Sequence, residues 1–152
     1  MRTIVLGVAA FAALMMVQAS AQAAEMGAAK ATYVDSQRLL DNFGKANANP
    51  IVPGTGYEVQ TNRRVKNGNI EIHLKETDIF YVMDGSATIL VGGTAVEPSE
   101  RRPNQLTAKD ISNPESYNLK KGDVLVIPAG TPHWFKQVNG SIDYLVVKHI
   151  KP

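Results

Sequence analysis

Hydrophobic residues follow three different patterns along the chain, and each pattern predicts a different kind of structure. Residues 4–17 form an almost unbroken apolar run, preceded by the basic Arg2 and followed by the small residues Ala21 and Ala23. This order of positive charge, apolar run and small residues is that of a secretory signal peptide. We predict removal of residues 1–23 and export of the protein to the periplasm or the exterior.

The apolar run is too short for a membrane-spanning helix. It has 14 residues, whereas roughly 20 are needed to cross a bilayer. The chain also has no cysteine that could carry a lipid. We therefore expect no membrane anchor after cleavage, and the alternative is that the run is retained as a permanent N-terminal anchor.

The second pattern is a short amphipathic helix from Asp35 to Phe43. Asp35 is a favourable N-cap, and Gly44 is a favourable residue just beyond the C-terminal end. The apolar stripe of this helix consists of Leu39, Leu40 and Phe43. We assign the helix to an N-terminal arm of residues 24–50.

The third pattern, from residue 51 to residue 152, consists of short alternating segments separated by Gly, Pro and Asn. This pattern is typical of an all-β sandwich or barrel. The predicted strands are Tyr57 to Lys66, Asn69 to Leu74, Ile79 to Met83, Ala87 to Val91, Val124 to Ile127, His133 to Val138 and Ile142 to His149. Hairpin turns are expected at Asn67-Gly68, Asp84-Gly85, Gly92-Gly93 and Asn139-Gly140, because Gly and Asn accept positive φ angles.

The segment from residue 97 to residue 118 is long, polar and interrupted by three prolines. We predict a loop there, with at most one short strand around Leu106 to Ile111. Long loops in small domains are often functional, so the two alternatives are a solvated excursion and a lid.

Length and charge narrow the range of functions. Removal of 23 residues from 152 leaves 129, which is enough for one domain with one core. The formal net charge of +2 falls to +1 when Arg2 is removed, and no basic and aromatic stripe is present. We therefore expect no nucleic-acid partner. Without cysteine, only histidine and carboxylates remain as strong metal ligands.

Two motifs about fifty residues apart carry the candidate chemistry. The first is Glu71-x-His73-x4-Asp78-x6-Gly85, and the second is Gly122-x5-Pro128-x-Gly130-x2-His133. Glu71 and His73 are two residues apart on a predicted strand, so both side chains face the same way. Periodicity alone would bury the neighbouring isoleucines and leave Glu71 and His73 in water.

The two motifs, taken together and in this order, resemble those of the cupin superfamily. The resemblance implies an all-β double-stranded β-helix, a jelly-roll-like barrel, with the site in its mouth. It also implies that Glu71 and His73 turn into the barrel, so that the opposite face must be covered. That face consists of Ile70, Ile72 and Leu74. The helix stripe and a second subunit of a homodimer are the two candidate covers.

The resemblance implies a metal site at Glu71, His73, Asp78 and His133. Glu71 stands where the family pattern has its first histidine, and Asp78 stands where it has glutamate. Two imidazoles and two carboxylates suit a divalent ion such as Mn, Fe, Ni or Zn. Because aspartate is shorter than glutamate, Asp78 is expected to reach the ion through water. The alternative is a metal-free barrel in which these groups form a hydrogen-bonded network.

Three further residues are predicted to bind a small molecule. Arg63 would point inward if it shares the side of Val59 and Val65, and Phe135 could line an apolar mouth after His133. Gln137 stands where the second cupin motif often has asparagine. The implied functions are a metal-dependent enzyme of the dioxygenase, isomerase or lyase type, or a non-catalytic barrel that binds a sugar or organic acid. Fold alone does not choose between them.

Overall fold

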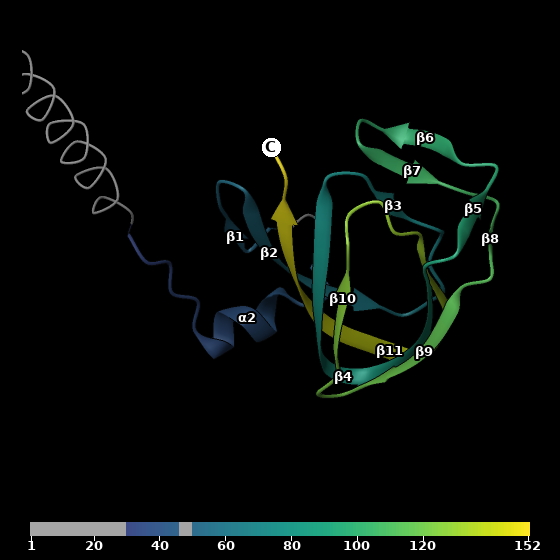
Figure 1. Ribbon diagram of the computed structural model, residues 1–152. Helices are drawn as coiled ribbons and strands as arrows, with labels where there is room; N and C mark the ends of the chain where they lie inside the picture. The colour runs from purple at the N-terminus through teal and green to yellow at the C-terminus, as the bar shows by residue number, and fades with distance from the viewer. Residues whose placement is uncertain (1–29, 46–49) are drawn as a thin grey trace, which may run out of the picture. The chain divides into compact units, whose positions relative to one another are not determined.

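Alternating residues after position 50 form the strands that dominate the computed structural model (Figure 1). The structure describes residues 30–45 and 50–152, so the predicted signal peptide lies outside the described residues. Residues 34–152 form one compact unit. Within the described part of the chain, no helix has the length and apolar character needed to cross a membrane.

One helix and eleven strands are assigned in the described residues. They are α2 (Ser36–Asn42), β1 (Val52–Pro53), β2 (Tyr57–Arg64), β3 (Ile72–His73), β4 (Glu76–Val91), β5 (Thr94–Val96), β6 (Ser99–Arg102), β7 (Gln105–Thr107), β8 (Asp110–Ser112), β9 (Glu115–Lys120), β10 (Val124–Ile127) and β11 (His133–Ile150). The largest sheet has the order β1-β2-β11-β4-β10, and β9 pairs with the second half of β4. This arrangement confirms the predicted all-β fold of the double-stranded β-helix type.

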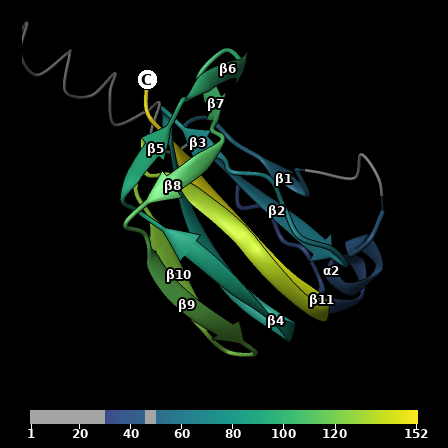
Figure 2. The ribbon, with the colours of Figure 1, turned by 90° about the vertical axis from the view of Figure 1, so that its right-hand side faces the viewer.

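Two long antiparallel strands, β4 and β11, run side by side through the barrel (Figure 2). Their pairing extends from His133 opposite Val91 to Ile150 opposite Glu76. Each was predicted as two strands with a hairpin turn between them, and that prediction is wrong. The Gly and Asn residues at these positions form bends within continuous strands, because both strands must curve to close the barrel.

Gly85 shows why a glycine is needed at such a bend. Its φ angle is +76°, and Ile142 lies opposite it across a register shift in β11. A Cβ atom at Gly85 would lie 2.0 Å from the backbone oxygen of Ser141. The glycine therefore allows both a left-handed backbone and a close approach of the two strands. The other two predicted hairpins are also wrong, since β2 does not pair with β3, nor β4 with β5, in the described residues.

The segment from residue 97 to residue 118 was predicted to be a loop, and this prediction is wrong. It contributes β6, β7, β8 and the start of β9. Asn104 lies between β6 and β7 with a φ angle of +61°, which asparagine tolerates better than most residues. β7 pairs with β3, so the β6–β7 hairpin extends the sheet that carries His73. The polar, proline-containing segment of residues 97–118 thus forms one edge of the site.

The predicted helix is present, and Asp35 caps it by accepting a 2.8 Å hydrogen bond from the Arg38 backbone N–H. Asn42 at its end donates a 2.7 Å hydrogen bond to Thr61 on β2. Phe43 is buried, whereas Leu40 is 57% exposed. Together with Tyr81, these two apolar residues border a hollow on the outside of the barrel.

The face opposite Glu71 and His73 was predicted to be covered at Ile70, Ile72 and Leu74, and the prediction is confirmed for the two isoleucines and wrong for Leu74. Ile70 and Ile72 are each 4% exposed, whereas Leu74 is 45% exposed. The main core lies between the halves of the barrel and is built from the inward residues of β4, β9, β10 and β11. Its members include Phe80, Val82, Ile89, Leu119, Ile127, Phe135, Ile142, Tyr144 and Val146. This core fills one end of the barrel and leaves the other end for the polar site.

Candidate metal centre

The backbone brings the two sequence motifs directly together. The Glu71 N–H donates to the His133 carbonyl at 2.9 Å, and the His133 N–H donates to the Glu71 carbonyl at 3.0 Å. The Gly130 N–H donates to the His73 carbonyl at 2.8 Å, which ties the turn before β11 to β3. Residues that are sixty positions apart in the sequence therefore become cross-strand neighbours.

The four predicted ligand side chains converge on one region of the pocket. His73 Nε2 lies 3.4 Å from Asp78 Oδ2, and His133 Nε2 lies 3.9 Å from the same oxygen. His133 Nε2 is also 3.9 Å from Glu71 Oε2. Two atoms bound to one ion at 2.0–2.2 Å are roughly 3 to 4 Å apart, so these separations suit a shared divalent metal.

Hydrogen bonds at the other nitrogen of each ring orient the histidines toward the pocket. His133 Nδ1 lies 3.1 Å from the Thr131 carbonyl oxygen, and His73 Nδ1 contacts the side-chain oxygen of Gln105. Gln105 is itself oriented, because its amide nitrogen donates to Glu76 at 2.9 Å. Both acceptors require Nδ1 to carry the proton, which leaves both Nε2 lone pairs free for a metal. The donor set therefore fits a divalent ion.

A buried lysine sits beside these ligands. Lys148 faces Asp78 across the β4–β11 ladder and donates to Asp78 Oδ1 at 2.8 Å and to Glu76 Oε2 at 2.7 Å. Burial lowers the pKa of Lys148, but its attraction to Asp78 and Glu76 outweighs that effect and raises the pKa above 10.5. The ammonium group is therefore charged at neutral pH. It occupies one oxygen of Asp78 and leaves Oδ2 facing the two histidines.

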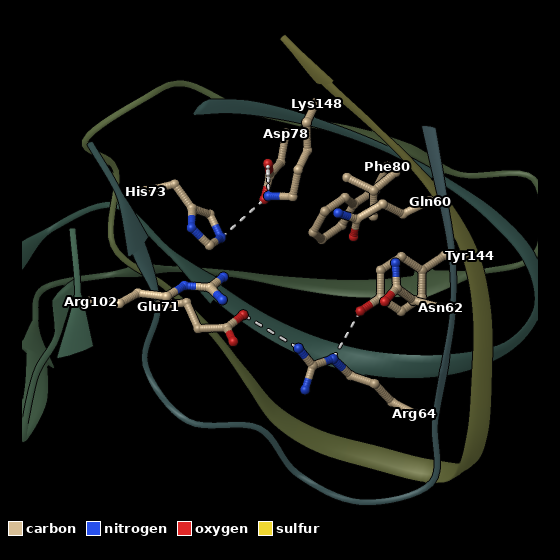
Figure 3. A pocket seen from close by; sticks show the side chains of 11 residues that line it. Gln60, Asn62, Arg64, Glu71, His73, Asp78, Phe80, Arg102, Tyr144 and Lys148 are labelled. Carbon is tan, nitrogen blue, oxygen red and sulfur yellow. Dashed lines mark hydrogen bonds and ion pairs between the residues drawn. The ribbon is translucent and has the colours of Figure 1, made fainter. Parts of the chain in front are cut away.

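The opposite wall of the pocket is polar and carries an arginine held at several points (Figure 3). Arg64 Nε donates to the Tyr144 hydroxyl at 2.8 Å, and a terminal nitrogen donates to Glu71 at 3.3 Å. The guanidinium carbon lies 4.7 Å from the centre of the Phe135 ring. Gln60, Asn62 and Arg102 also line this cavity, which has a volume of about 160 Å³.

Residues 49–147 match the cupin family. The chain belongs to the cupin family. The matched region contains the described barrel residues from β1 to Val147 near the end of β11, including both motifs and all four candidate ligands. The resemblance seen in the sequence is therefore confirmed at the level of the family.

Solved structures share the fold at low sequence identity. A double-stranded β-helix protein from Klebsiella pneumoniae is 13% identical, with a TM-score of 0.53 and coverage of 79% of this chain and 91% of that one. Hydroquinone 1,2-dioxygenase PnpCD in complex with Cd²⁺ is 18% identical, with a TM-score of 0.50 and 82% coverage of both chains. Oxalate oxidase is 22% identical with a TM-score of 0.44, and the match covers 62% of this chain and 42% of that one.

The structures with TM-scores of 0.53 and 0.50 share the fold of this chain. The chain spans about half or less of the length of several matched proteins, such as 52% of peruvianin-I and 42% of oxalate oxidase. The comparison with curated proteins gives no match.

The residues that line this cavity do not include the three predicted small-molecule contacts. Arg63 points to the other side of β2 and forms an ion pair of 2.5 Å with Asp143, so its predicted inward orientation is wrong. Phe135 is 2% exposed and packs against Phe80 and Tyr144 in the core of the cupin barrel. Gln137 is exposed and donates to Asn139 at 2.9 Å. On β2 the inward side chains are instead those of Gln60, Asn62 and Arg64.

Several site residues were not predicted from the sequence. Gln105 lies in the supposed loop, and Lys148 and Tyr144 lie on β11, outside both motifs. The available signal was alternation, because Tyr144, Val146 and Lys148 share one side of β11. Alternation alone does not show which side of a strand faces the pocket of a cupin barrel.

A pH dependence follows from the buried His133. Burial lowers its pKa below 6.5, and the nearby His73 acts in the same direction, whereas the Thr131 carbonyl, Asp78 and Glu71 oppose the shift. The unfolded chain therefore binds more protons than the folded chain just below pH 6.5. We expect the free energy of unfolding of the metal-free protein to decrease as the pH falls from 6.5 toward the folded pKa. The contribution of one proton cannot exceed about 1.4 kcal/mol per pH unit.

Urea unfolding of the wild type, His133→Gln and His149→Gln between pH 5 and pH 7.5 measures this effect. The slope should be smaller in His133→Gln and unchanged in His149→Gln, because His149 lies exposed near the end of β11. Equal slopes in all three proteins would contradict the assignment to His133.

Proposed function

We propose that the protein is an exported cupin that holds one divalent metal ion and binds a small molecule beside it. Glu71, His73 and His133 would hold the ion, with Asp78 as a further ligand, directly or through water. The observation that carries the proposal is that both histidines have Nδ1 bonded to an oxygen acceptor and Nε2 directed toward the carboxylates. A bound ion would act as a Lewis acid, with Mn, Fe, Ni and Zn as candidates.

The test of this proposal is the metal content of the purified protein. The protein should be prepared without chelator or His-tag, and a second sample should be refolded with excess Mn, Fe, Ni or Zn. Elemental analysis should give close to one ion per chain for at least one metal. Wild-type protein that retains no metal under any of these conditions would contradict the proposal.

A second candidate is a ligand-binding barrel without metal, and the placement of Lys148 favours it. Its ammonium group already bonds Asp78 and Glu76, so part of the negative charge is neutralised without an ion. In that case a small polar molecule would bind to a protein that contains no metal. The two candidates therefore give opposite results in the metal analysis.

For the metal-bound form we propose chemistry of the dioxygenase, isomerase or lyase type. Tyr144 adds a hydroxyl group beside Arg64, and burial raises its pKa above 10 against the opposing effect of Arg64. This hydroxyl is protonated at neutral pH and can position a small molecule by hydrogen bonding.

Export is the part of the proposal that depends on the N-terminal sequence. We expect the mature protein to begin at Ala24, because Ala21-Gln22-Ala23 has the small-x-small pattern of a cleavage site. Intact mass and N-terminal sequencing of protein recovered from the periplasm or medium would measure this. A product that still begins with Met1, or one that begins within the barrel, would contradict it.

We also propose a homodimer formed through the outer face of the large sheet. β10 is an edge strand, and its outward residues Val124 and Val126 are 62% and 53% exposed. They lie beside Tyr81 and Ile79 on β4, and Ile79 is followed across the sheet by Val147 on β11. An open edge next to an exposed apolar stripe commonly marks a contact surface.

The dimer can be tested by sedimentation. Wild-type protein should sediment as a dimer, and Val126→Lys should sediment as a monomer because a charge would enter the apolar contact. Val65→Lys is the matched control, since Val65 is 66% exposed beyond the end of β2. A monomeric wild type, or a variant that remains a dimer at the same concentration, would contradict this surface.

A further inference from the structure

The positively charged side chains that line the cavity of about 160 Å³ outnumber the carboxylates that line it. Arg64, Arg102 and Lys148 line it, together with two carboxylates, Glu71 and Asp78. Lys148 donates to Asp78 and to Glu76, which lies next to it, so its charge is already paired. The two arginines are therefore the groups left to bind a ligand.

The guanidinium group of Arg64 is held in place by two neighbouring side chains. Tyr144 fixes its Nε, and Phe135 supports the face of its guanidinium group. A guanidinium has five N–H donors, and two of them have protein acceptors among the described residues, so three remain. The side chain of Arg64 is 26% exposed and lines the cavity. One terminal nitrogen lies beside Gly68, and the other bonds Glu71 and keeps a second N–H for a ligand.

Arg102 approaches the cavity from the β6–β7 hairpin. Figure 3 shows its guanidinium group between His73 and Glu71, directed toward the middle of the pocket. Within the described residues, no carboxylate lies within 4.0 Å of Arg102. Its neighbour Arg101 instead approaches Glu71 Oε1, at 3.8 Å. Arg102 is an exposed residue at the rim, and it brings a positive charge without a carboxylate partner to the same cavity as Arg64.

The charges around the cavity favour an anion even before a metal is bound. Four cations, Arg64, Arg101, Arg102 and Lys148, lie at or beside it with three carboxylates, Glu71, Glu76 and Asp78. With neutral histidines, four positive and three negative charges leave a sum of +1, and a divalent ion would raise it further. Arg101 and Arg102 are exposed, whereas Lys148 is buried and Arg64 is half-buried. A ligand with one or two negative charges would reduce the excess positive charge.

The size of the cavity limits this ligand to a small molecule. A cavity of roughly 150 Å³ accommodates a molecule of the size of benzene. The neighbouring side chains of Asn62 and Tyr144 offer hydrogen bonds to its uncharged polar groups. We propose that the ligand is a small organic acid whose carboxylate is bound by Arg64 and Arg102. This inference rests on the proposed function and narrows its small molecule to a carboxylate.

Malonate is a suitable probe, with malonamide as its neutral counterpart of the same number of heavy atoms. Isothermal titration of the metal-free protein, prepared with a chelator that is then removed by desalting, separates binding by the arginines from direct binding to an ion. We expect malonate to bind and malonamide to bind at least about tenfold more weakly, because charge-assisted hydrogen bonds to guanidinium would be lost.

Arg64→Lys and Arg102→Gln should each weaken malonate binding by about tenfold or more, since each removes part of the guanidinium pair. Arg63→Gln is the matched control for β2, because Arg63 pairs with Asp143 on the other side of the strand. Lys109→Gln is the control for a lost surface charge, because Lys109 pairs with Glu97 at an exposed site. Both controls should bind malonate like the wild type.

The inference would be overturned if the metal-free protein did not bind malonate. It would also be overturned if malonamide bound equally well, or if the controls lost as much affinity as Arg64→Lys and Arg102→Gln. Failure of the metal proposal is a separate result. In that case wild-type protein takes up no ion while malonate binding still depends on Arg64 and Arg102.

Discussion

His73→Ala and His133→Ala are each expected to lose nearly all bound metal, whereas the wild type retains close to one ion per chain. Both Nε2 atoms point toward Asp78 Oδ2, and the described residues offer no further histidine near the site to replace either one. Asp78→Ala should reduce the metal content less if that carboxylate reaches the ion through water. The measurement is elemental analysis of the proteins prepared in parallel.

His149→Ala is the control for this series because His149 lies exposed near the end of β11, outside the candidate cluster. It should retain as much metal as the wild type. Circular dichroism and urea unfolding should accompany the analysis, so that loss of metal can be separated from loss of the fold. Equal metal content in wild type, His73→Ala and His133→Ala would rule out a site shared by the two rings.

Lys148→Met is expected to destabilise the metal-free protein by about 3 kcal/mol or more, which is typical when one partner of a buried ion pair is removed. The side chain of Lys148 is 11% exposed, and its ammonium group bonds both Asp78 and Glu76. Without it, these two carboxylates would face each other and the pocket with no cation between them. Urea unfolding of metal-free wild type and variant measures the difference.

Added metal should reduce this difference. A divalent ion bound near Asp78 would supply the positive charge that Lys148→Met removes, and a ligand that binds only the folded state raises stability. Lys148→Arg, which keeps the charge, should be less destabilised than Lys148→Met. Lys109→Met is the surface control and should unfold like the wild type, because its ion pair with Glu97 is exposed. An unchanged free energy of unfolding in metal-free Lys148→Met would contradict the importance of this buried pair.

Alternation along β2 predicted the wrong side of the strand because it assumed that apolar residues face the barrel. In the structure, the inward side consists of Gln60, Asn62 and Arg64, and Arg63 lies on the outer side. Thr61, also on the outer side, is buried and bonded to Asn42 at the end of the helix. A shift of one residue reverses the side to which every side chain of a strand points. The incorrect assumption therefore led to the prediction of Arg63 instead of Arg64 as the arginine in the pocket.

The bends of β4 and β11 were read as hairpin turns for a related reason. Gly85 and Gly140 have the positive φ angles that the sequence analysis expected. Positive φ is required both in a tight turn and in a strongly bent strand, and local sequence does not distinguish the two. The continuous pairing of β4 with β11 resolved this ambiguity, because it depends on contacts between residues far apart in the sequence, from His133 with Val91 to Ile150 with Glu76.

Residue types and spacings alone predicted the fold family, the capped helix and the candidate ligands Glu71, His73, Asp78 and His133. These features depend on short spacings and residue types, which fix the local backbone and the side to which neighbouring residues point. The groups that surround the ligands could be identified only in the folded barrel. Gln105 orients His73, Lys148 engages Asp78, and Arg64 with Arg102 lines the other side of the pocket. Such contacts join distant strands, so they exist only after the barrel has closed.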